Sequence, residues 1–210
     1  MTTKDRIYRS PMALVGGVLL LALAGWLGID ALIRGEGRTP WLALAALLTF
    51  VPLVVAYTLR PAVFAGEDRL RVRNPLRDVT LPWGEIASLR SGYTNEVVAN
   101  SGDKFQLWAV PVSLRGRKRA ARRQQRRDAQ AAAAKAGKRV RGSAFGPAAD
   151  LDEGPLRDEG DKIMDELRAM REAREKAKTS QGEVTVRWAY EIIAPAVVGA
   201  VLLAVLSALG

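Results

Sequence analysis

Three long runs without a charged residue constrain this chain more than any other feature of its sequence. They cover residues 11–29, 40–59 and 192–210 and contain 19, 20 and 19 residues. A helix rises about 1.5 Å per residue, so each run is roughly 28 to 30 Å long and matches the hydrocarbon core of a bilayer. Three such helices cannot all be buried within so small a soluble domain. We therefore predict three transmembrane helices, two before and one after a central soluble region.

A cleaved signal peptide is an alternative explanation of the first run. Lys4, Arg6 and Arg9 form a basic N-terminal segment, and residues 22–24 (Ala-Leu-Ala) resemble a cleavage site. The apolar stretch, however, continues to Ile29, which is longer than the roughly 7 to 15 apolar residues of a typical signal peptide. A second apolar run follows closely. A hairpin of two membrane-spanning helices accounts for both runs.

The positions of Lys and Arg predict the orientation, because loops on the cytoplasmic side carry more of them. Residues 1–10 contain three, and many follow residue 59, whereas in residues 30–39 Arg34 and Arg38 are offset by two acidic residues. We expect a multi-pass protein of the cell membrane. Residues 1–10 and the central region are expected in the cytoplasm, and the C-terminus outside.

The absence of cysteine and histidine from the sequence removes several kinds of chemistry. Disulfides, thiolate nucleophiles, Cys/His zinc sites and Ser-His pairs are all excluded. The acidic residues Glu67, Asp68, Glu85 and Asp103 fall in predicted turns or at strand ends without a recognisable catalytic arrangement, and no phosphate-binding Gly-rich loop is present. We therefore predict no enzyme activity, and no catalytic, cofactor-binding or metal-binding residues.

Residues 60–112 change from helical periodicity to the alternation that is typical of strands. Turn-forming Gly, Pro, Asn and Asp separate the short apolar segments, as in residues 66–68 and 100–103. The predicted strands cover residues 62–64, 70–73, 78–81, 85–89, 96–99 and 104–110. This pattern indicates a small antiparallel β domain between the second and third apolar runs.

Three segments of this region carry a family resemblance: residues 66–74, residues 81–86 and residues 100–110. Together they resemble the bacterial pleckstrin-homology (PH)-like domain of the low-molecular-weight protein antigen type, common in membrane proteins of actinobacteria. The most specific element is Pro82-Trp83-x-x-Ile86, whose side chains are expected in the core. The resemblance implies an α+β fold, with a strongly bent antiparallel sheet closed by a helix, and no catalytic activity.

The closing helix is predicted over residues 161–178. Ile163, Leu167 and Met170 recur at the spacing of one helix face, and Asp161 is a candidate N-cap. Residues 113–160 depart from the family pattern, and we interpret them as an insertion that begins as a basic helix and is mostly disordered. Residues 179–191 are either a linker or an added edge strand. Residues 183–188 alternate as a strand would, but this pattern does not decide between the two.

The insertion holds nearly all of the excess positive charge. Residues 115–141 contain twelve Lys or Arg and the single acidic residue Asp128, a net charge of +11, while the whole chain carries +10. Such a run can be a solvated segment that enforces topology, or it can bind anionic lipid headgroups. Nucleic acid is disfavoured because no aromatic residues are interleaved. The candidate lipid contacts are Arg115, Arg117, Lys118, Arg119, Arg122, Arg123, Arg126 and Arg127.

A second basic pattern, Arg69, Arg71 and Arg73, lies on one face of a predicted strand. In eukaryotic relatives of the fold, basic residues near the first hairpin hold phosphoinositides, but an exposed polar face opposite Leu70 and Val72 is the favoured explanation of this pattern. Our leading functional hypothesis is a membrane-anchored adaptor or scaffold that binds an unidentified protein partner. An anionic-lipid sensor is the alternative.

Overall fold

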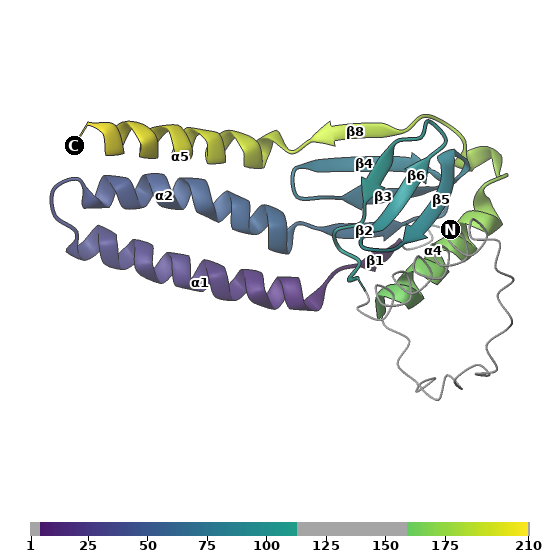
Figure 1. Cartoon of the computed structure of the whole chain (residues 1–210), viewed down its shortest axis with the longest axis horizontal. Helices are drawn as coiled ribbons and strands as arrows, with labels where there is room; N and C mark the ends of the chain where they lie inside the picture. The colour runs from purple at the N-terminus through teal and green to yellow at the C-terminus, as the bar shows by residue number, and fades with distance from the viewer. Residues whose placement is uncertain (1–4, 113–158, 210) are drawn as a thin grey trace, which may run out of the picture.

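The computed structural model describes residues 5–112 and 159–209. Figure 1 shows a layer of long helices at one end and a β domain at the other, so that the chain is elongated. Three helices are long and apolar enough to cross a membrane: Pro11–Arg34, Thr39–Leu59 and Tyr190–Ala208. The prediction of an α+β protein with two such helices before the β domain and one after it is confirmed.

The first helix, α1 (Pro11–Arg34), is longer than the uncharged run that predicted it. It begins where Ser10 caps it, since the Ser10 side chain accepts a hydrogen bond from the Ala13 amide at 3.4 Å. At the other end the helix continues past Ile29 for about another turn. Asp30 and Arg34 pair at 3.1 Å one helical turn apart, which allows charged residues to extend the helix beyond the apolar run.

The second helix, α2 (Thr39–Val54), contains Pro52 and continues directly into a π-helical segment, η1 (Val55–Leu59). A proline has no amide hydrogen to donate to the helix. Just after Pro52, the backbone hydrogen bonds change from the α-helical spacing of four residues to the π-helical spacing of five. The Arg60 amide then bonds to the carbonyl of Val55 at 2.9 Å, five residues back. The span therefore passes Pro52 without a break and ends at Leu59, directly before Arg60.

The helix α2 lies between α1 and the last helix, α5 (Tyr190–Ala208), in a nearly flat layer (Figure 1). Glycines allow the close approach on both sides of α2. A Cβ on Gly28 of α1 would lie 2.5 Å from Leu47, and one on Gly199 of α5 would lie 2.6 Å from the Thr49 amide. Gly28 and Gly199 therefore serve packing within the chain.

The β domain consists of two antiparallel sheets. The first has the order β1-β2-β3-β4-β8, and the second has the order β5-β6-β7. A short 3₁₀ turn at Trp83–Glu85 joins them. The strands of the first sheet are β1 (Arg6–Tyr8), β2 (Ala62–Ala65), β3 (Arg69–Arg73), β4 (Arg77–Pro82) and β8 (Thr185–Trp188). Those of the second are β5 (Ile86–Ser91), β6 (Asn95–Ala99) and β7 (Lys104–Gln106).

Apart from shifts of one or two residues at strand ends, the structure adds to or corrects the sequence expectations at three strands. Within residues 1–10, for which no strand was predicted, β1 pairs with β2. The last predicted strand was too long, because β7 ends at Gln106 and the chain turns at residues 108–109. The open question over residues 183–188 is settled in favour of an edge strand, since β8 pairs with β4 along its whole length.

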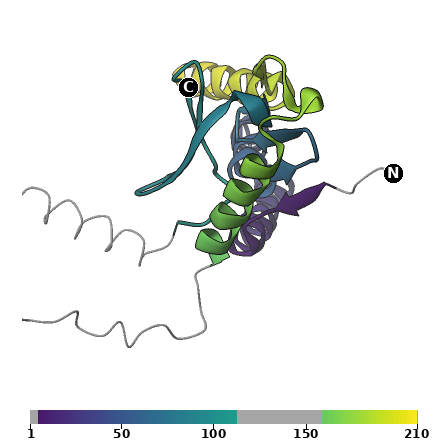
Figure 2. The same cartoon turned by 90° about the vertical axis from the view of Figure 1, so that its right-hand side faces the viewer.

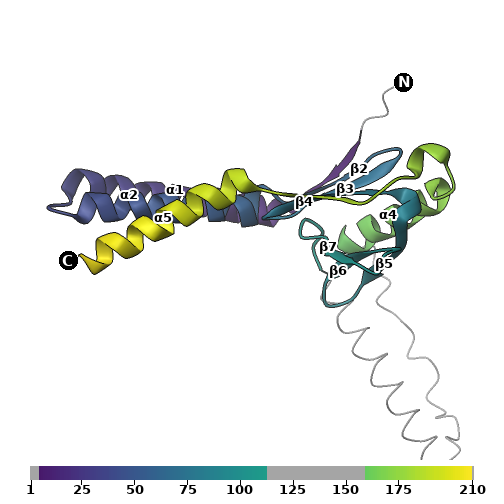
Figure 3. The same cartoon turned by 90° about the horizontal axis from the view of Figure 1, so that it is seen from above.

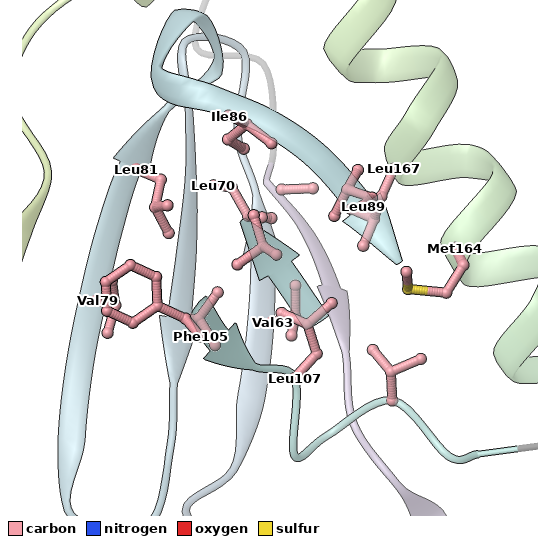
Figure 4. Close-up of a cluster of buried hydrophobic side chains, with 14 of the residues drawn as sticks. Val63, Leu70, Val79, Leu81, Ile86, Leu89, Phe105, Leu107, Met164 and Leu167 are labelled. Carbon is pink, nitrogen blue, oxygen red and sulfur yellow. The ribbon is translucent and has the colours of Figure 1, made fainter. Parts of the chain in front are cut away.

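The core lies between the two sheets and the helix α4 (Glu159–Arg174). Figure 4 shows side chains from both sheets and from α4 pointing toward one another. Ile163, Met164 and Leu167 of α4 are buried in this core, and Met170 packs at its margin. The predicted closing helix, residues 161–178, overlaps α4 over most of its length. Asp161, expected as its N-cap, lies instead in its first turn, because the described helix already begins at Glu159.

Two arginines on α4 hold it against the second sheet, in addition to the apolar contacts. Arg171 donates to the carbonyl of Ile86 at 2.6 Å, and Arg168 donates to the carbonyl of Leu89 at 3.3 Å. Figures 2 and 3 show α4 crossing the part of the β domain that faces away from the three long helices. The helix ends at Arg174, four residues before the predicted end at residue 178.

Candidate membrane-interface site

The chain passes three times between the β domain and the long helices, each time through a very short connection. Residues 9–10 join β1 to α1, residues 60–61 join η1 to β2, and Ala189 alone joins β8 to α5. We call this region the junction. Short connections leave little freedom between the strands and the helices that continue them. The first sheet is therefore held directly by all three helices (Figure 1).

The turn between β3 and β4 packs into the junction. Leu76 contacts a small apolar cluster that contains Ala56 of η1, and Ala189 and Ile192 at the start of α5. The Leu76 carbonyl also accepts a hydrogen bond from the Ala189 amide at 2.9 Å. The turn therefore ties the β domain to two helices that are far apart in the sequence.

Arg60 forms a second tie, which we call the Arg60 clasp. Its guanidinium pairs with Asp78 of β4 at 3.1 Å and with Glu191 of α5 at 2.8 Å, while its side chain is only 13% exposed. Its Nε also donates to the Asn74 carbonyl at 3.4 Å. A largely buried cation needs such partners, because an unpaired charge out of water is strongly unfavourable. One side chain, directly after η1, thereby joins the β3–β4 hairpin to α5.

A cavity of about 220 Å³ lies next to the clasp. Its walls combine three aromatic rings with polar side chains and part of the β3–β4 turn. The ring of Tyr57 meets that of Trp108 edge-on, with 5.7 Å between the ring centroids. The lining residues are Tyr57, Asn74, Pro75, Leu76, Arg77, Gln106, Trp108 and Trp188.

Two of the residues that line this cavity, Asn74 and Arg77, carry polar groups that stand out among the described residues. The side-chain oxygen Oδ1 of Asn74 is buried and has no hydrogen-bond partner there. The guanidinium of Arg77 lies 5.5 Å from the centre of the Phe105 ring, and in the described part of the chain it forms no ion pair. The cavity therefore offers an acceptor without a donor and a cation without an anion.

The outer face of the first sheet carries the second basic pattern of the sequence. The register places Phe64, Arg71 and Thr80 in one row across β2, β3 and β4, while Leu70 and Val72 point into the core. Arg71 lies over the Phe64 ring at 4.3 Å and covers it, so that Phe64 is buried, whereas Ile7 of β1 continues the same row and is exposed. Nearest the junction, Arg73 approaches Asp78 at 3.9 Å.

The residues of the predicted family motif lie at the bend between the two sheets. Trp83 is fully buried, and its indole nitrogen donates to the Gly66 carbonyl at 3.1 Å. Pro82 and Ile86 are buried on either side of it. The other predicted site residues, from Arg115 to Arg127 in the basic segment, lie outside the described residues, as does the rest of the insertion except for residues 159–160.

At the opposite side of the core, β1 contacts α4. The Tyr8 phenol donates to the Glu166 carboxylate at 2.7 Å, and Arg6 approaches the same carboxylate at 3.4 Å. Burial and then the neighbouring Glu166 raise the pKa of Tyr8 to about 12. The strand that leads into α1 is thus connected to the closing helix.

The sequence interpretation missed the junction residues Arg60, Asn74 and Arg77. One signal was available, because Arg60 and Glu191 are the charged residues that border the second and third apolar runs. Charges at those positions lie at the same membrane surface if the spans are antiparallel. The pairing with Asp78 and the cavity depend on the β3–β4 turn, which no local pattern places against the helices.

The described residues define a class of protein: a PH-like domain of antiparallel strands with a closing helix, joined to helices long and apolar enough to cross a membrane. Residues 60–143 match the family model described as a bacterial PH domain. The resemblance inferred from the sequence is thereby confirmed at the level of the PH domain, and the match covers less than half of the chain. No curated protein and no solved structure matches the chain.

Proposed function

We propose that this protein is a non-catalytic, membrane-anchored adaptor that presents its PH-like domain in a fixed orientation at the membrane surface. The observation that carries the proposal is the Arg60 clasp, which links α2, the β3–β4 hairpin and α5 through one largely buried cation. A domain tethered only for localisation needs no such contacts. A domain that offers one face to a partner gains from them, because a fixed orientation lowers the entropy lost on binding.

The outer face of the first sheet is the surface that we assign to the partner. It is the face opposite the core and α4, and it ends at the edge strand β8, all of whose residues are exposed. Its charged residues are mostly basic: Arg69, Arg71, Arg73 and Arg187, with Asp78 as the acidic exception. A protein with an acidic surface is the complementary partner.

The distribution of Lys and Arg supports an orientation with the β domain and residues 1–10 in the cytoplasm and the C-terminus outside. In this orientation the outer face is available to cytoplasmic proteins. The segments that resemble the low-molecular-weight protein antigen type, residues 66–74 and 81–86, support assignment to that type of actinobacterial membrane protein.

Site-specific photocrosslinking in cells tests the adaptor role. A photoreactive residue at Arg71 or Arg187, both exposed on the outer face, is compared with one at Glu172, which is exposed on α4. The proposal predicts a discrete protein adduct from the outer-face positions and none from Glu172. Replacing Arg187 by Glu should weaken the adduct formed from position 71. Adducts with lipid alone, or equal labelling from all three positions, would contradict the adaptor role.

Anionic-lipid sensing by residues 115–141 is a second candidate, favoured by the net charge of +11 in that segment. The chain contains no cysteine, so Asp128→Cys gives a single labelling site in the segment. With an environment-sensitive dye there, the full chain is placed in nanodiscs of neutral or anionic lipid. Lipid sensing predicts a fluorescence shift only with anionic lipid, reduced at high salt. Identical spectra in both nanodiscs would exclude it.

A further inference from the structure

We infer that the cavity at the junction binds one phospholipid headgroup, through a phosphate on Arg77 and a hydrogen-bond donor on Asn74. The headgroup is that of a phosphodiester with a hydroxyl or ammonium donor beyond the phosphate, such as a glycerol or ethanolamine headgroup. This site lies outside the basic segment at residues 115–141. It does not depend on the proposed adaptor role.

The first argument is the depth of the cavity in the membrane. Tyr57 belongs to η1, near the end of the second apolar span, and Trp188 lies two residues before α5 begins. Both line the cavity, together with Trp108. Tyr and Trp concentrate at the level of the lipid headgroups, where an amphipathic ring is most stable. The cavity therefore lies where headgroups are abundant.

The second argument is the unpartnered acceptor. Asn74 is only 3% exposed, and its Oδ1 lacks a partner among the described residues. The backbone of Asn74 is fixed on both sides, because its amide donates to the Arg77 carbonyl at 2.9 Å and its own carbonyl accepts from Arg60. A buried carbonyl oxygen without a donor is unfavourable unless a ligand supplies one. The complementary group is a hydroxyl or an ammonium.

The third argument is the difference between the neighbouring arginines. Arg60 pairs with Asp78 and Glu191, and Arg73 approaches Asp78. Arg77 pairs with no carboxylate in the described part of the chain and only stacks over the Phe105 ring. A guanidinium held by an aromatic ring keeps its donors available, and phosphate is the anion that suits their planar geometry.

The size of the cavity limits the ligand. Its volume of about 220 Å³ lies below the roughly 300 to 1,000 Å³ of pockets for drug-sized ligands. The cavity is open to its surroundings, so a phosphate with a small alcohol or amine can occupy it while the acyl chains lie outside it along the helices. Phosphatidylcholine, whose quaternary ammonium has no hydrogen to donate, satisfies Arg77 but not Asn74.

Native mass spectrometry of the full chain in detergent tests this site. The chain is incubated with equal amounts of phosphatidylglycerol, phosphatidylethanolamine and phosphatidylcholine, and the retained lipid is identified. We expect one retained molecule, with either donor-bearing lipid preferred over phosphatidylcholine by at least about fivefold. Equal retention of phosphatidylcholine would overturn the assignment, and this competition needs no variant that must fold.

Variants then locate the site. Arg77→Gln should lower retention of the preferred lipid about tenfold, whereas the matched control Arg71→Gln, on the outer face, should leave it unchanged. Asn74→Leu should remove the preference over phosphatidylcholine. Equal losses from Arg71→Gln and Arg77→Gln would indicate diffuse attraction to the surface and would overturn the site. Glycerol 3-phosphate serves as the soluble competitor, and its displacement of the lipid at equal concentration would assign the cavity to a soluble ligand instead.

Discussion

The two ends of the β domain are held by different forces. At the junction, a largely buried arginine with two carboxylate partners and a small apolar cluster connect the domain to the helices. At the other end, α4 is held by the large apolar core. Its Arg174 also forms an ion pair with Glu67, in which each side chain is 42% exposed. Exposed ion pairs contribute little, whereas a buried charge depends strongly on its partners. Orientation is therefore encoded by charge at the junction, and stability by apolar packing under α4.

The largest effect should come from the apolar end. Leu167 is fully buried, so Leu167→Ala removes packing and leaves a cavity, and should lower the free energy of unfolding by about 2 to 5 kcal/mol. Chemical unfolding of the full chain in detergent, followed by circular dichroism, measures the loss. Met170→Ala, at the margin of the same helix face, is the matched control and should cost clearly less. Equal losses would contradict the role assigned to the core under α4.

A smaller effect is expected at the junction. Arg60→Met keeps the apolar stem but leaves Asp78 without its closest cation, and should lower the free energy of unfolding by about 1 to 3 kcal/mol. Arg174→Met removes an exposed pair and should cost less than about 1 kcal/mol in the same measurement. If the two substitutions had the same effect, the contrast between the two ends would fail.

The contact between β1 and α4 is tested separately, because it appears as a pH dependence. Burial and Glu166 raise the pKa of Tyr8 from 10.0 to about 12, so the folded state keeps its proton where the unfolded state has lost it. This contribution to stability is complete below pH 10 and declines as the pH rises toward 12. Glu166→Gln should lower the pKa of Tyr8, as measured by ultraviolet titration of tyrosinate. Subtraction of the Tyr8→Phe titration isolates this residue, and an unchanged pKa would exclude Glu166 as a cause.

The parts that the sequence predicted are those encoded by local pattern. The three apolar runs, most of the strands and the spacing of Ile163 and Leu167 each reveal an element without knowledge of its neighbours. The sequence did not predict β1, because three residues carry too little periodicity to indicate a strand. Its partner β2 also follows only after two long helices. Pairing across the sheet, not propensity, creates that strand.

The candidate site was less predictable than the fold, for a related reason. Arg60 and Glu191 are separated by 131 positions, and only the packing of α2 against α5 brings them together. The predicted strand over residues 70–73 does end before Asn74, but the contacts of Asn74 with Arg60 and of Leu76 with the helices depend on where the turn points. The chemistry of the junction therefore arises from tertiary contacts between segments, none of which carries a local sequence pattern that indicates a site.

The central claim is that the PH-like domain is held in one orientation relative to the helices. Because the chain has no cysteine, spin labels can be attached at Ser101→Cys in the β6–β7 turn and Ser207→Cys near the end of α5 without further changes. Distances between the labels are then measured by pulsed electron resonance on the full chain in nanodiscs. The account predicts one narrow distance distribution, which Arg60→Met broadens and Arg174→Met leaves unchanged. A broad distribution in the otherwise unaltered chain would contradict it.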